Sequence, residues 1–519
     1  MSAFSELLIR QQRRVWVATA LTLLWVIGCG TPTSDRSMVG PSTENSPPSD
    51  DIEEQVVHFC GDCHAMPRPE SFPKDAWHSE VRRGFDFYVS SGRTDLNAPI
   101  LAEVSRYFRE RAPVTLRYTP SAASGLPSLF RPVAGLLQDT TGQRSVSFVS
   151  EHRDGPELSW WVSDMQQGTV SLLTMDGNTA WTNSSATSNP AVVRVCDLDG
   201  NGKQDLLCCD LGSFLPEDHD RGRLVWIRNR GTEQQQEVTL LNAVGRIADV
   251  RVADIDGDTD DDLVVAEFGW HKTGGIHLLE NTGKSETGGL TFKATELDDR
   301  PGTIHVYVTH LNADTLPDIV ALISQEHEQI VAFVNGEAGY SRTVLYQAPG
   351  PAYGSSGFSL VDIDRDGDED MLYTNGDTFD SHLLKPYHSI AWLENKGELD
   401  FEYHHLATMP GVHRAMAMDF DLDGDIDIAA VALLPLQTLE QHSSVKFHGA
   451  IWLEQMSNGQ FEEHVISSGD PIHATMALSD IDGDGDMDIV AGNMRSAQSR
   501  SLISLFENRA VMAKKPPAN

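Results

Sequence analysis

Basic residues are scarce in this sequence. Its 519 residues include 39 Lys and Arg against 76 Asp and Glu, which gives a formal net charge of −37 at pH 7. Because proteins that bind nucleic acid need Lys and Arg beside the phosphates, we expect no nucleic-acid partner. Long apolar runs are also missing, since the run from Val15 to Ile27 is too short to span a bilayer comfortably. The chain has no nucleophile elbow, Rossmann fingerprint or HExxH motif, so no reaction class is specified.

The acidic residues, by contrast, follow a pattern. From Asp480 to Asp488 the chain reads Asp-Ile-Asp-Gly-Asp-Gly-Asp-Met-Asp, with a carboxylate at every second position. Such a loop points its carboxylates at one centre, and calcium takes about six to eight oxygen ligands of this kind. An EF-hand is excluded, because the Glu of its loop position 12 is missing and strand-like apolar residues follow. The stretch therefore predicts a calcium loop that leads into a strand.

The pattern recurs along the chain. First loop positions fall at 197, 254, 310, 362, 419 and 480, with spacings of 57, 56, 52, 57 and 61 residues, which indicates a repeat architecture. A seventh, degraded copy is expected at Asp139. The copy at His310, Asn312, Asp314 and Asp318 is weakened. The predicted metal ligands of the other five loops are Asp197, Asp199, Asn201, Asp205; Asp254, Asp256, Asp258, Asp262; Asp362, Asp364, Asp366, Asp370; Asp419, Asp421, Asp423, Asp427; and Asp480, Asp482, Asp484, Asp488.

Aspartate loops followed by Asp-Leu-Val or Asp-Ile-Val resemble the FG-GAP or VCBS repeats of bacterial surface proteins and of the integrin alpha-chain head. That resemblance covers residues 125–510 and implies a seven-bladed β-propeller with calcium in its blade loops. The fold class we expect is therefore mainly β, with a small all-α domain in front of the propeller. A fold of this kind does not specify an activity, which has to be argued from a site.

Each unit is interpreted as one four-stranded blade. An inner strand such as Ile247 to Ala253 enters the aspartate loop, and a buried strand such as Leu263 to Ala266 leaves it. A third strand ends in an Asn turn, as in Ile276 to Asn281, and an outer strand such as Phe461 to Ile466 completes the blade. We expect strands from the two ends of the propeller to share one blade and close the ring.

The calcium is expected to be structural, because carboxylates this close repel one another without a cation. Solvated loops without calcium and a ligand-bridging or catalytic metal are the alternatives. The additional acids Asp260, Asp368, Asp425 and Asp486 are expected to face solvent or to coordinate through their carbonyl groups. The weak loops at Asp139 and His310 are expected to bind nothing.

Residues 1–29 have the features of an export signal, with Arg10, Arg13 and Arg14 ahead of the apolar run. Val26-Ile27-Gly28-Cys29 resembles the bacterial lipobox, which implies acylation of Cys29 and attachment to a membrane surface. A plain secretory signal is the alternative. Residues 30–50, rich in Ser, Thr and Pro, are expected to form a disordered tether. We expect an exported protein on the periplasmic or cell-surface side.

Cys60-Gly61-Asp62-Cys63-His64 is the C-x-x-C-H signature of covalent haem c attachment. Both thiols add to the haem and His64 ligates the iron. A zinc knuckle lacks a second nearby Cys pair, and a thioredoxin-like dithiol lacks its βαβ context. Residues 51–115 are therefore predicted to form a small helical domain similar to a single-haem cytochrome c.

Three helices are expected in this domain. One runs into the haem motif, one follows Pro73 and carries Trp77, Val81 and Phe85, and one runs from Ala98 to about Arg111 after Asn97. The sixth iron ligand is open. Met66 lies too close to His64 to reach the other haem face, so His78 is the candidate, with an open position as the alternative.

A second candidate site lies at the propeller axis. His305, Tyr353, His413 and His473 each stand near the start of an inner strand, where side chains can ring an axial channel. Ordinary packing is the alternative for all four. The insertion at 377–388, with Lys385, Tyr387 and His388, is expected to overhang one face. Cys196 and Cys208 can form a disulfide or remain free, and with Cys209 the count leaves one thiol unpaired.

The leading hypothesis is an exported, membrane-anchored electron-transfer protein that carries haem c, with a calcium-stabilised propeller that docks a redox partner and a protein or polysaccharide ligand. The alternative is an enzyme, either a haem-coupled dehydrogenase or a polysaccharide-acting enzyme, with its active site at the propeller axis. Residues 511–519 are expected to form a tail.

Overall fold

The structure, a computed structural model, describes residues 50–118, 129–133, 144–155, 157–183, 185–286, 289–494 and 501–511. The chain divides into two compact units, residues 1–47 and residues 48–519. The first unit lies outside the described residues, and so do the export signal, Cys29 and almost all of the tether. Among the described residues, no helix has the length and apolar character needed to cross a bilayer.

One antiparallel sheet of four strands occurs seven times in the described part of the chain. The strands of the sheets, in chain order, are β2 (Val146–Asp154), β3 (Glu157–Asp164), β4 (Thr169–Thr174) and β5 (Thr179–Asn183); β6 (Pro190–Cys196), β7 (Asp205–Asp210), β8 (Gly222–Arg228) and β9 (Gln236–Val244); β10 (Ile247–Ala253), β11 (Asp262–Glu267), β12 (Gly275–Lys284) and β13 (Leu290–Asp298); β14 (Thr303–Thr309), β15 (Asp318–Ile323), β16 (Gln329–Val334) and β17 (Ser341–Gln347); β18 (Ser355–Val361), β19 (Asp370–Asn375), β20 (Ser389–Asn395) and β21 (Phe401–Thr408); β22 (Val412–Met418), β23 (Asp427–Ala432), β24 (His448–Gln455) and β25 (Phe461–Ser468); and β26 (His473–Ser479), β27 (Asp488–Asn493), β28 (Ile503–Glu507) and β1 (Arg131–Val133).

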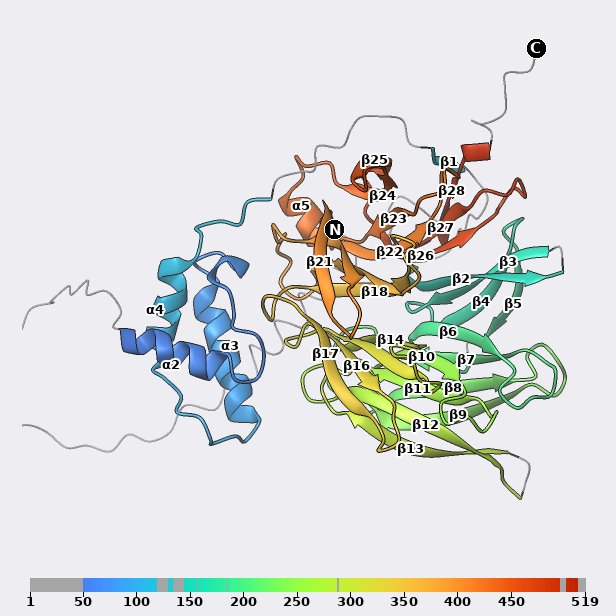
Figure 1. Cartoon of the computed structure of the whole chain (residues 1–519), viewed down its shortest axis with the longest axis horizontal. Helices are drawn as coiled ribbons and strands as arrows, with labels where there is room; N and C mark the ends of the chain where they lie inside the picture. Colours follow the sequence, from blue (N-terminus) through green and yellow to red (C-terminus); the bar gives the residue numbers. More distant parts are fainter. Residues whose placement is uncertain are drawn as a thin grey trace, which may run out of the picture. The chain divides into compact units, whose positions relative to one another are not determined.

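These sheets are the blades of a seven-bladed β-propeller. The first strands of neighbouring blades contact one another in a complete circle, β2–β6–β10–β14–β18–β22–β26 and back to β2. Figure 1 shows the blades following one another around a common axis in chain order. The prediction of seven units, each with an inner, a buried, a third and an outer strand, is confirmed.

The ring closes as expected, by mixing strands from both ends of the propeller. β1 pairs with β28 through Arg131–Glu507 and Pro132–Phe506, so the start of the propeller supplies the outer strand of its last blade. β1 is short and lies at the sheet edge, where a proline is tolerated because an edge strand has N–H groups that need no partner.

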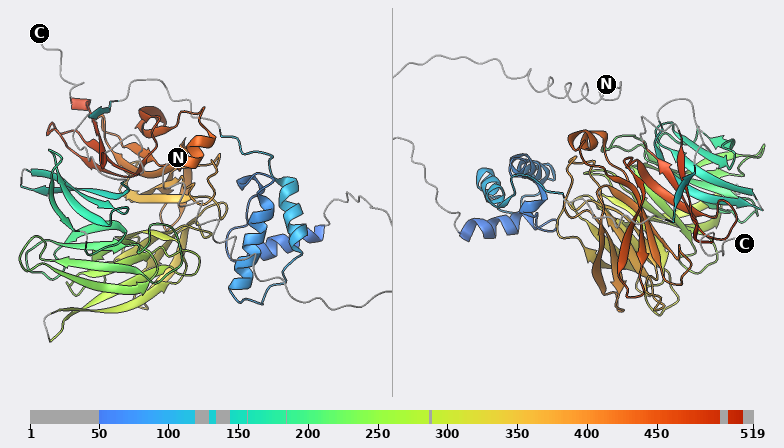
Figure 2. Two further views of the ribbon diagram at one scale, coloured as in Figure 1. Left: turned by 180° about the vertical axis from the view of Figure 1, so that it is seen from behind. Right: turned by 90° about the horizontal axis from the view of Figure 1, so that it is seen from above.

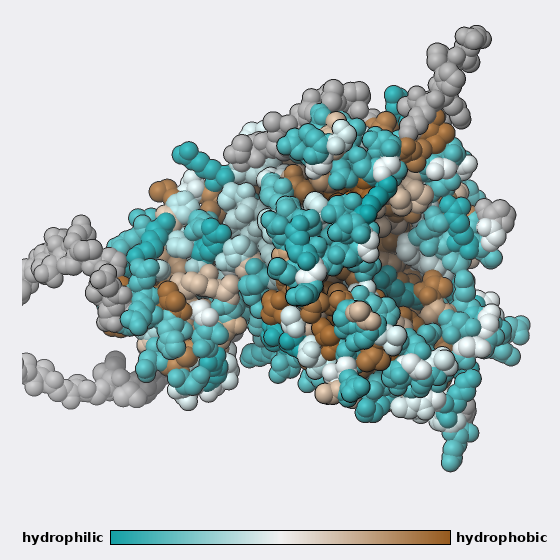
Figure 3. All heavy atoms as spheres, in the orientation of Figure 1, coloured by the Kyte–Doolittle hydropathy of each residue, from teal (hydrophilic) through white to brown (hydrophobic). Residues whose placement is uncertain are grey.

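Burial follows each strand's place in its blade. The second strands β7, β11, β15, β19, β23 and β27 are buried at every residue, because both faces pack against neighbouring blades. Outer strands such as β9 alternate partly buried with exposed residues. On the face shown in Figure 3, hydrophilic side chains dominate and apolar ones gather in the hollowed parts.

The seventh unit differs from its prediction. Asp139 lies outside the described residues. The blade it was meant to start is formed by β2–β5, and the turn that corresponds to the aspartate loops joins Asp154 at the end of β2 to Glu157 at the start of β3. This short turn has no room for a nine-residue loop, so the spacing rule alone placed the copy too early.

In residues 50–118 three α-helices precede the propeller, namely α2 (Asp50–Cys60), α3 (Trp77–Ser90) and α4 (Leu101–Arg111), with a short 3₁₀ helix, η1 (Pro69–Ser71), after α2. Figure 2 shows them in blue in two further views. Trp77 stacks on Phe108 with ring centroids 4.1 Å apart, and its Nε1 donates to the carbonyl of Pro69 at 2.9 Å. α4 begins later than predicted because Pro99 disfavours helical geometry at Ala98. A further short helix, α5 (Leu436–Gln441), lies between β23 and β24.

Candidate functional site

The aspartate loops join the first strand to the second strand of their blades, as predicted. In four loops, carboxylate oxygens from three residues lie within 4.8 Å of one another. These groups are Asp197, Asp199 and Asp205; Asp254, Asp256 and Asp262; Asp362, Asp364 and Asp370; and Asp419, Asp421 and Asp423. The sequence pattern thus brings alternate carboxylates to one centre in each loop.

Backbone hydrogen bonds curl the loops. In the loop from Asp362 to Asp370, the first carboxylate accepts the N–H groups of Asp366 and Gly367, both at 3.1 Å. Gly367 has φ of 101°, a left-handed conformation that favours glycine. The corresponding carboxylates Asp197 and Asp254 accept equivalent bonds at 2.7 to 3.0 Å. Each loop is therefore folded by its own first residue.

Several loop oxygens are buried and have no hydrogen-bond partner, namely Oδ1 of Asp368, Asp419, Asp425 and Asp486 and Oδ2 of Asp484. Burial is the main factor that raises the pKa of Asp425 to about 6. Repulsion from the neighbouring carboxylates of Asp423, Asp421 and Asp419 adds to this shift. Buried, unpartnered oxygens beside like charges fit a bound cation. Asp368, Asp425 and Asp486 do not simply face solvent as expected, because each turns one oxygen inward.

The last aspartate of each loop has a different environment. These loop-closing aspartates, Asp205, Asp262, Asp318, Asp370, Asp427 and Asp488, are each at most 1% exposed. In all six blades Oδ1 accepts a backbone N–H at 2.6 to 2.8 Å from a residue in the C-terminal part of the third strand or directly after it. In all but Asp205, Oδ2 accepts the N–H of the second loop residue at 2.6 to 3.1 Å. Asp205 Oδ2 instead accepts the Trp226 indole N–H at 2.9 Å.

These bonds explain two parts of the repeat pattern. The loop-closing aspartate ties the loop to the third strand. An Asn supplies the N–H in five blades: it follows the strand at Asn229, Asn335 and Asn508, ends it at Asn395 and lies within it at Asn281. The sequence analysis assigned five of these aspartates to the metal alone and gave Asp318, in the weak loop, no ligand. Their burial and double hydrogen bonding give them a role in the fold whether or not a cation is present.

A second candidate site surrounds the C-x-x-C-H motif. Cys60 ends α2, and Cys63 and His64 follow in the next turn. All three line one cavity of about 480 Å³, together with aromatic side chains including Phe59 and Tyr88. This volume lies within the usual range of about 300–1,000 Å³ for ligand and cofactor sites. The structure thus brings together the three residues that the motif singled out.

The donor atoms of this motif suit covalent attachment and iron ligation. Both cysteines are free thiols, and burial raises the pKa of Cys60 to about 12. Arg93 Nη1 lies 2.9 Å from Cys63 Sγ, and Arg93 also pairs with Asp62 at 2.6 Å. His64 Nδ1 lies 2.8 Å from the carbonyl oxygen of Ala65. That bond makes Nδ1 the protonated nitrogen and leaves the Nε2 lone pair available to a metal.

The predicted sixth ligand is placed elsewhere. His78 is exposed on α3 and is not among the residues that line the cavity. Met66 packs against the helical core, as its short separation from His64 suggested. The structure therefore gives His78 no position beside Cys60 and Cys63.

Propeller turns supply the remaining wall of the cavity. Residues 270–272, 325–327 and 351–352 and Asp380 line it opposite the helical segment. The insertion at 377–388 holds this arrangement: Lys385 Nζ donates to the Ser71 carbonyl at 2.6 Å and lies 3.7 Å from the Phe72 ring centroid. Burial lowers the pKa of Lys385 to about 8. Sequence reasoning expected the insertion to overhang one face but did not connect it with the haem motif.

Only one of the four axial candidates lies in a charged cluster. His305 Nδ1 is 3.6 Å from the buried Asp249, which also pairs with Arg194 at 2.7 Å and Arg251 at 3.4 Å. Burial alone would raise the pKa of Asp249, but the two arginines and His305 hold it well below its ordinary value. This cluster joins the first strands of three blades near the axis.

The other three axial candidates are packed separately. The Tyr353 ring stacks on Tyr387 at 5.0 Å, His413 Nδ1 lies 2.9 Å from the Gly411 carbonyl, and His473 is buried 6.0 Å from the Phe506 ring. Separate packing of this kind supports their structural interpretation.

The three propeller cysteines form no disulfide with one another. Cys196, Cys208 and Cys209 are free thiols. Cys208 stands opposite Val193 in the sheet and Cys196 stands opposite Asp205, so the disulfide considered from the sequence does not form.

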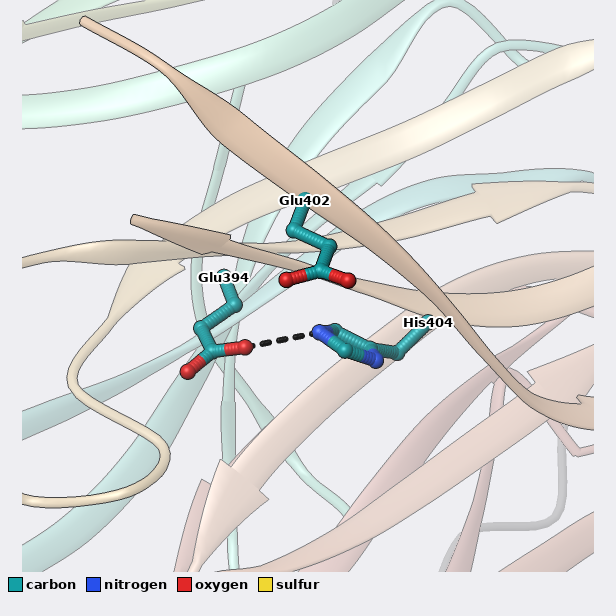
Figure 4. Close-up of side chains that lie close together, drawn as sticks. All are labelled: Glu394, Glu402 and His404. Carbon is teal, nitrogen blue, oxygen red and sulfur yellow. Dashed lines mark hydrogen bonds and ion pairs between the residues drawn. The ribbon is translucent and has the colours of Figure 1, made fainter. Parts of the chain in front are cut away.

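Figure 4 shows a third group, Glu394, Glu402 and His404, whose ligand atoms also lie within 4.8 Å. His404 Nε2 is 2.7 Å from Glu394 Oε2, and Lys396 pairs with both carboxylates. In the next blade, His464 Nε2 again lies 2.7 Å from a glutamate oxygen, Glu454 Oε2, and the His464 ring stacks on Trp452. Repetition on equivalent strands, with a lysine already neutralising the acids, fits cross-strand packing.

Comparison with known proteins agrees with the fold. Residues 197–265 match the FG-GAP-like repeat. This segment contains the loops that begin at Asp197 and Asp254. A search of curated proteins found no significant match to the chain.

Solved structures resemble this chain only at low identity and low TM-score. A chain from the crystal structure of BBS1N in complex with ARL6DN, soaked with lead, is 13% identical with a TM-score of 0.45, covering 76% of this chain and 99% of that one. Rhamnogalacturonan lyase YesW is 14% identical with a TM-score of 0.39, covering 73% and 75%. An ancestral GH74 enzyme is 12% identical with a TM-score of 0.47, covering 73% of this chain and 51% of that one. Similarity at this level carries no argument about function.

Proposed function

We propose that this chain is an exported, membrane-anchored lipoprotein that carries one covalent haem c and transfers electrons. Its propeller, stabilised by calcium, binds the redox partner and a protein or polysaccharide ligand. One observation carries the proposal: Cys60, Cys63 and His64 open onto a single cavity of suitable size, and the free Nε2 of His64 is ready to ligate a metal. Bound haem would supply one-electron chemistry at its iron.

The chain's own residues hold and shield this group. Cys60 and Cys63 would bind it covalently, and Phe59, Phe85 and Tyr88 supply an aromatic wall, since Phe59 lies 4.9 Å from Phe85 and 5.1 Å from Tyr88. Arg93, also in the lining, places a positive charge beside Cys63. An apolar, partly closed wall of this kind keeps water from most of a bound cofactor and tunes its reduction potential.

The aspartate loops supply the second part of the proposal. The inward, unpartnered oxygens of the loops that begin at Asp362, Asp419 and Asp480 suit calcium. Calcium in all five loops would neutralise part of the net charge of −37 and fix the turns of five blades. An enzyme with its site at the propeller axis has less support, because the axial candidates other than His305 do not converge.

The proposal is tested by exporting the full chain from a bacterial host that attaches haem c. Wild type is expected to retain haem through denaturing electrophoresis and to fractionate with membranes. Cys60→Ala with Cys63→Ala should remove all covalent haem, whereas Cys196→Ala, the matched control, should keep it. Cys29→Ala should release the protein from the membrane fraction with its haem intact. Wild-type protein without covalent haem would refute the electron-transfer function.

A further inference from the structure

The cavity around the C-x-x-C-H motif is built from two parts of the chain that lie far apart in sequence. Helical residues provide the cysteines and His64, and propeller turns provide Trp270 to Lys272, Gln325 to His327 and Pro351 with Ala352. A flat porphyrin fixed on the helical wall therefore has propeller residues on its remaining side. Any iron ligand on that side has to come from this lining.

Few lining residues can act as that ligand. Besides His64, the cavity lining contains two histidines, His271 and His327, and no methionine. The His271 ring packs against two aromatic side chains, with its centroid 4.7 Å from that of Phe87 and 4.4 Å from that of Trp270. His327 lines the same cavity as His64, and the two rings are close enough to interact electrostatically.

The turn that carries His327 is fixed to the propeller. It joins β15 to β16, and the next residue, Glu328, has φ of 48° and is fully enclosed. The Glu328 carboxylate accepts the N–H groups of Gly354 and Ser355 in the next blade, both at 2.8 Å. Gln347 Nε2 donates to the His327 carbonyl at 3.0 Å. Such anchoring fixes the backbone that carries the His327 imidazole, as a preorganised ligand site needs.

We propose that His327, on the β15–β16 turn of the propeller, is the sixth ligand of the haem iron held by Cys60, Cys63 and His64. This inference rests on the proposed haem function and adds to it, because the propeller then completes the redox centre. Two histidine ligands set a low potential compared with a His/Met pair. Separation of the helical segment from the propeller would open the sixth position and raise the affinity for small ligands.

The test compares matured full-length variants by visible spectroscopy and by binding of carbon monoxide and imidazole. Wild type is expected to be six-coordinate and low-spin. His327→Ala should keep covalent haem but become high-spin, bind carbon monoxide after reduction, and return to the low-spin spectrum with imidazole. His271→Ala and His78→Ala, the matched controls, should retain the wild-type spectrum. His327→Met should remain six-coordinate with a higher reduction potential. This variant tests the proposal even if His327→Ala does not fold.

Outcomes that overturn the two claims differ. A low-spin spectrum in His327→Ala, or a high-spin wild type that retains covalent haem, contradicts the role of His327 and leaves the haem function standing. Loss of the low-spin state in His271→Ala or His78→Ala assigns the ligand to that residue instead. A wild type without covalent haem contradicts both claims.

Discussion

The aspartate loops and the C-x-x-C-H cavity are built in opposite ways. Each loop is assembled from nine consecutive residues, and its own first and last carboxylates fold it. The cavity joins residues 267 positions apart, from Cys60 to His327. A site of the first kind is specified locally and can be copied from blade to blade. A site of the second kind exists only when the whole chain has folded.

A comparison among the loops adds a further distinction. The weak loop starting at His310 has lost its first carboxylate, and His310 Nδ1 instead lies 3.1 Å from the Leu316 carbonyl. Asp318 nevertheless keeps both bonds of a loop-closing aspartate, at 2.8 Å each. The alternate acids and the loop-closing aspartate are therefore separable, the first suited to a cation and the second to the sheet.

Removal of calcium should have the largest effect on the propeller. Chelation is expected to lower its thermal unfolding temperature, because each loop loses about 2.7 kcal/mol of linkage stabilisation at calcium 100-fold above its dissociation constant. The haem spectrum should not change, since the cavity contains none of the loop acids. Calorimetry with and without chelator measures the effect, with added magnesium as a control for ionic strength. An unfolding temperature independent of chelator would contradict bound calcium.

Loop-closing aspartates should matter even in the loop in which His310 and Asn312 replace the first two acids. Asp318→Ala is expected to cost about 4 kcal/mol in the free energy of unfolding, because two buried N–H groups lose a charged acceptor. Asp370→Ala should cost a similar amount in chelator and more in calcium. Denaturant unfolding measures both, and the exposed Asp314→Ala serves as the matched control. A negligible change in the free energy of unfolding for Asp318→Ala would contradict the distinction between the cation-binding acids and the loop-closing aspartates.

The contact made by Lys385 predicts a smaller, pH-dependent effect. Its pKa falls from an ordinary value of 10.5 to about 8 on burial, so between these values the folded state holds a neutral amine while the unfolded chain still binds the proton. Stability should therefore rise with pH across this window, by up to about 3 kcal/mol. Lys385→Met should flatten this slope relative to wild type in unfolding measurements from pH 8 to pH 10.5, and equal slopes would show that the amine is not buried.

The local regions were the predictable ones. Spacing of the acids gave the number of blades, the strand order and the loops, since period and turn chemistry act over a few residues. The position predicted for the seventh loop, at Asp139, was wrong because a degraded copy keeps no acidic ligands that would fix its register. His327 and the Lys385 contact gave no local signal, because their role depends on turns that meet only in the folded chain.

Haem at the C-x-x-C-H motif is the central claim, and a reduced-minus-oxidised spectrum of the purified, exported full-length protein tests it most directly. The account predicts the sharp absorption bands of a low-spin c-type haem on reduction, absent from Cys60→Ala with Cys63→Ala. A featureless difference spectrum from wild type matured in a host that loads other c-type proteins would contradict it.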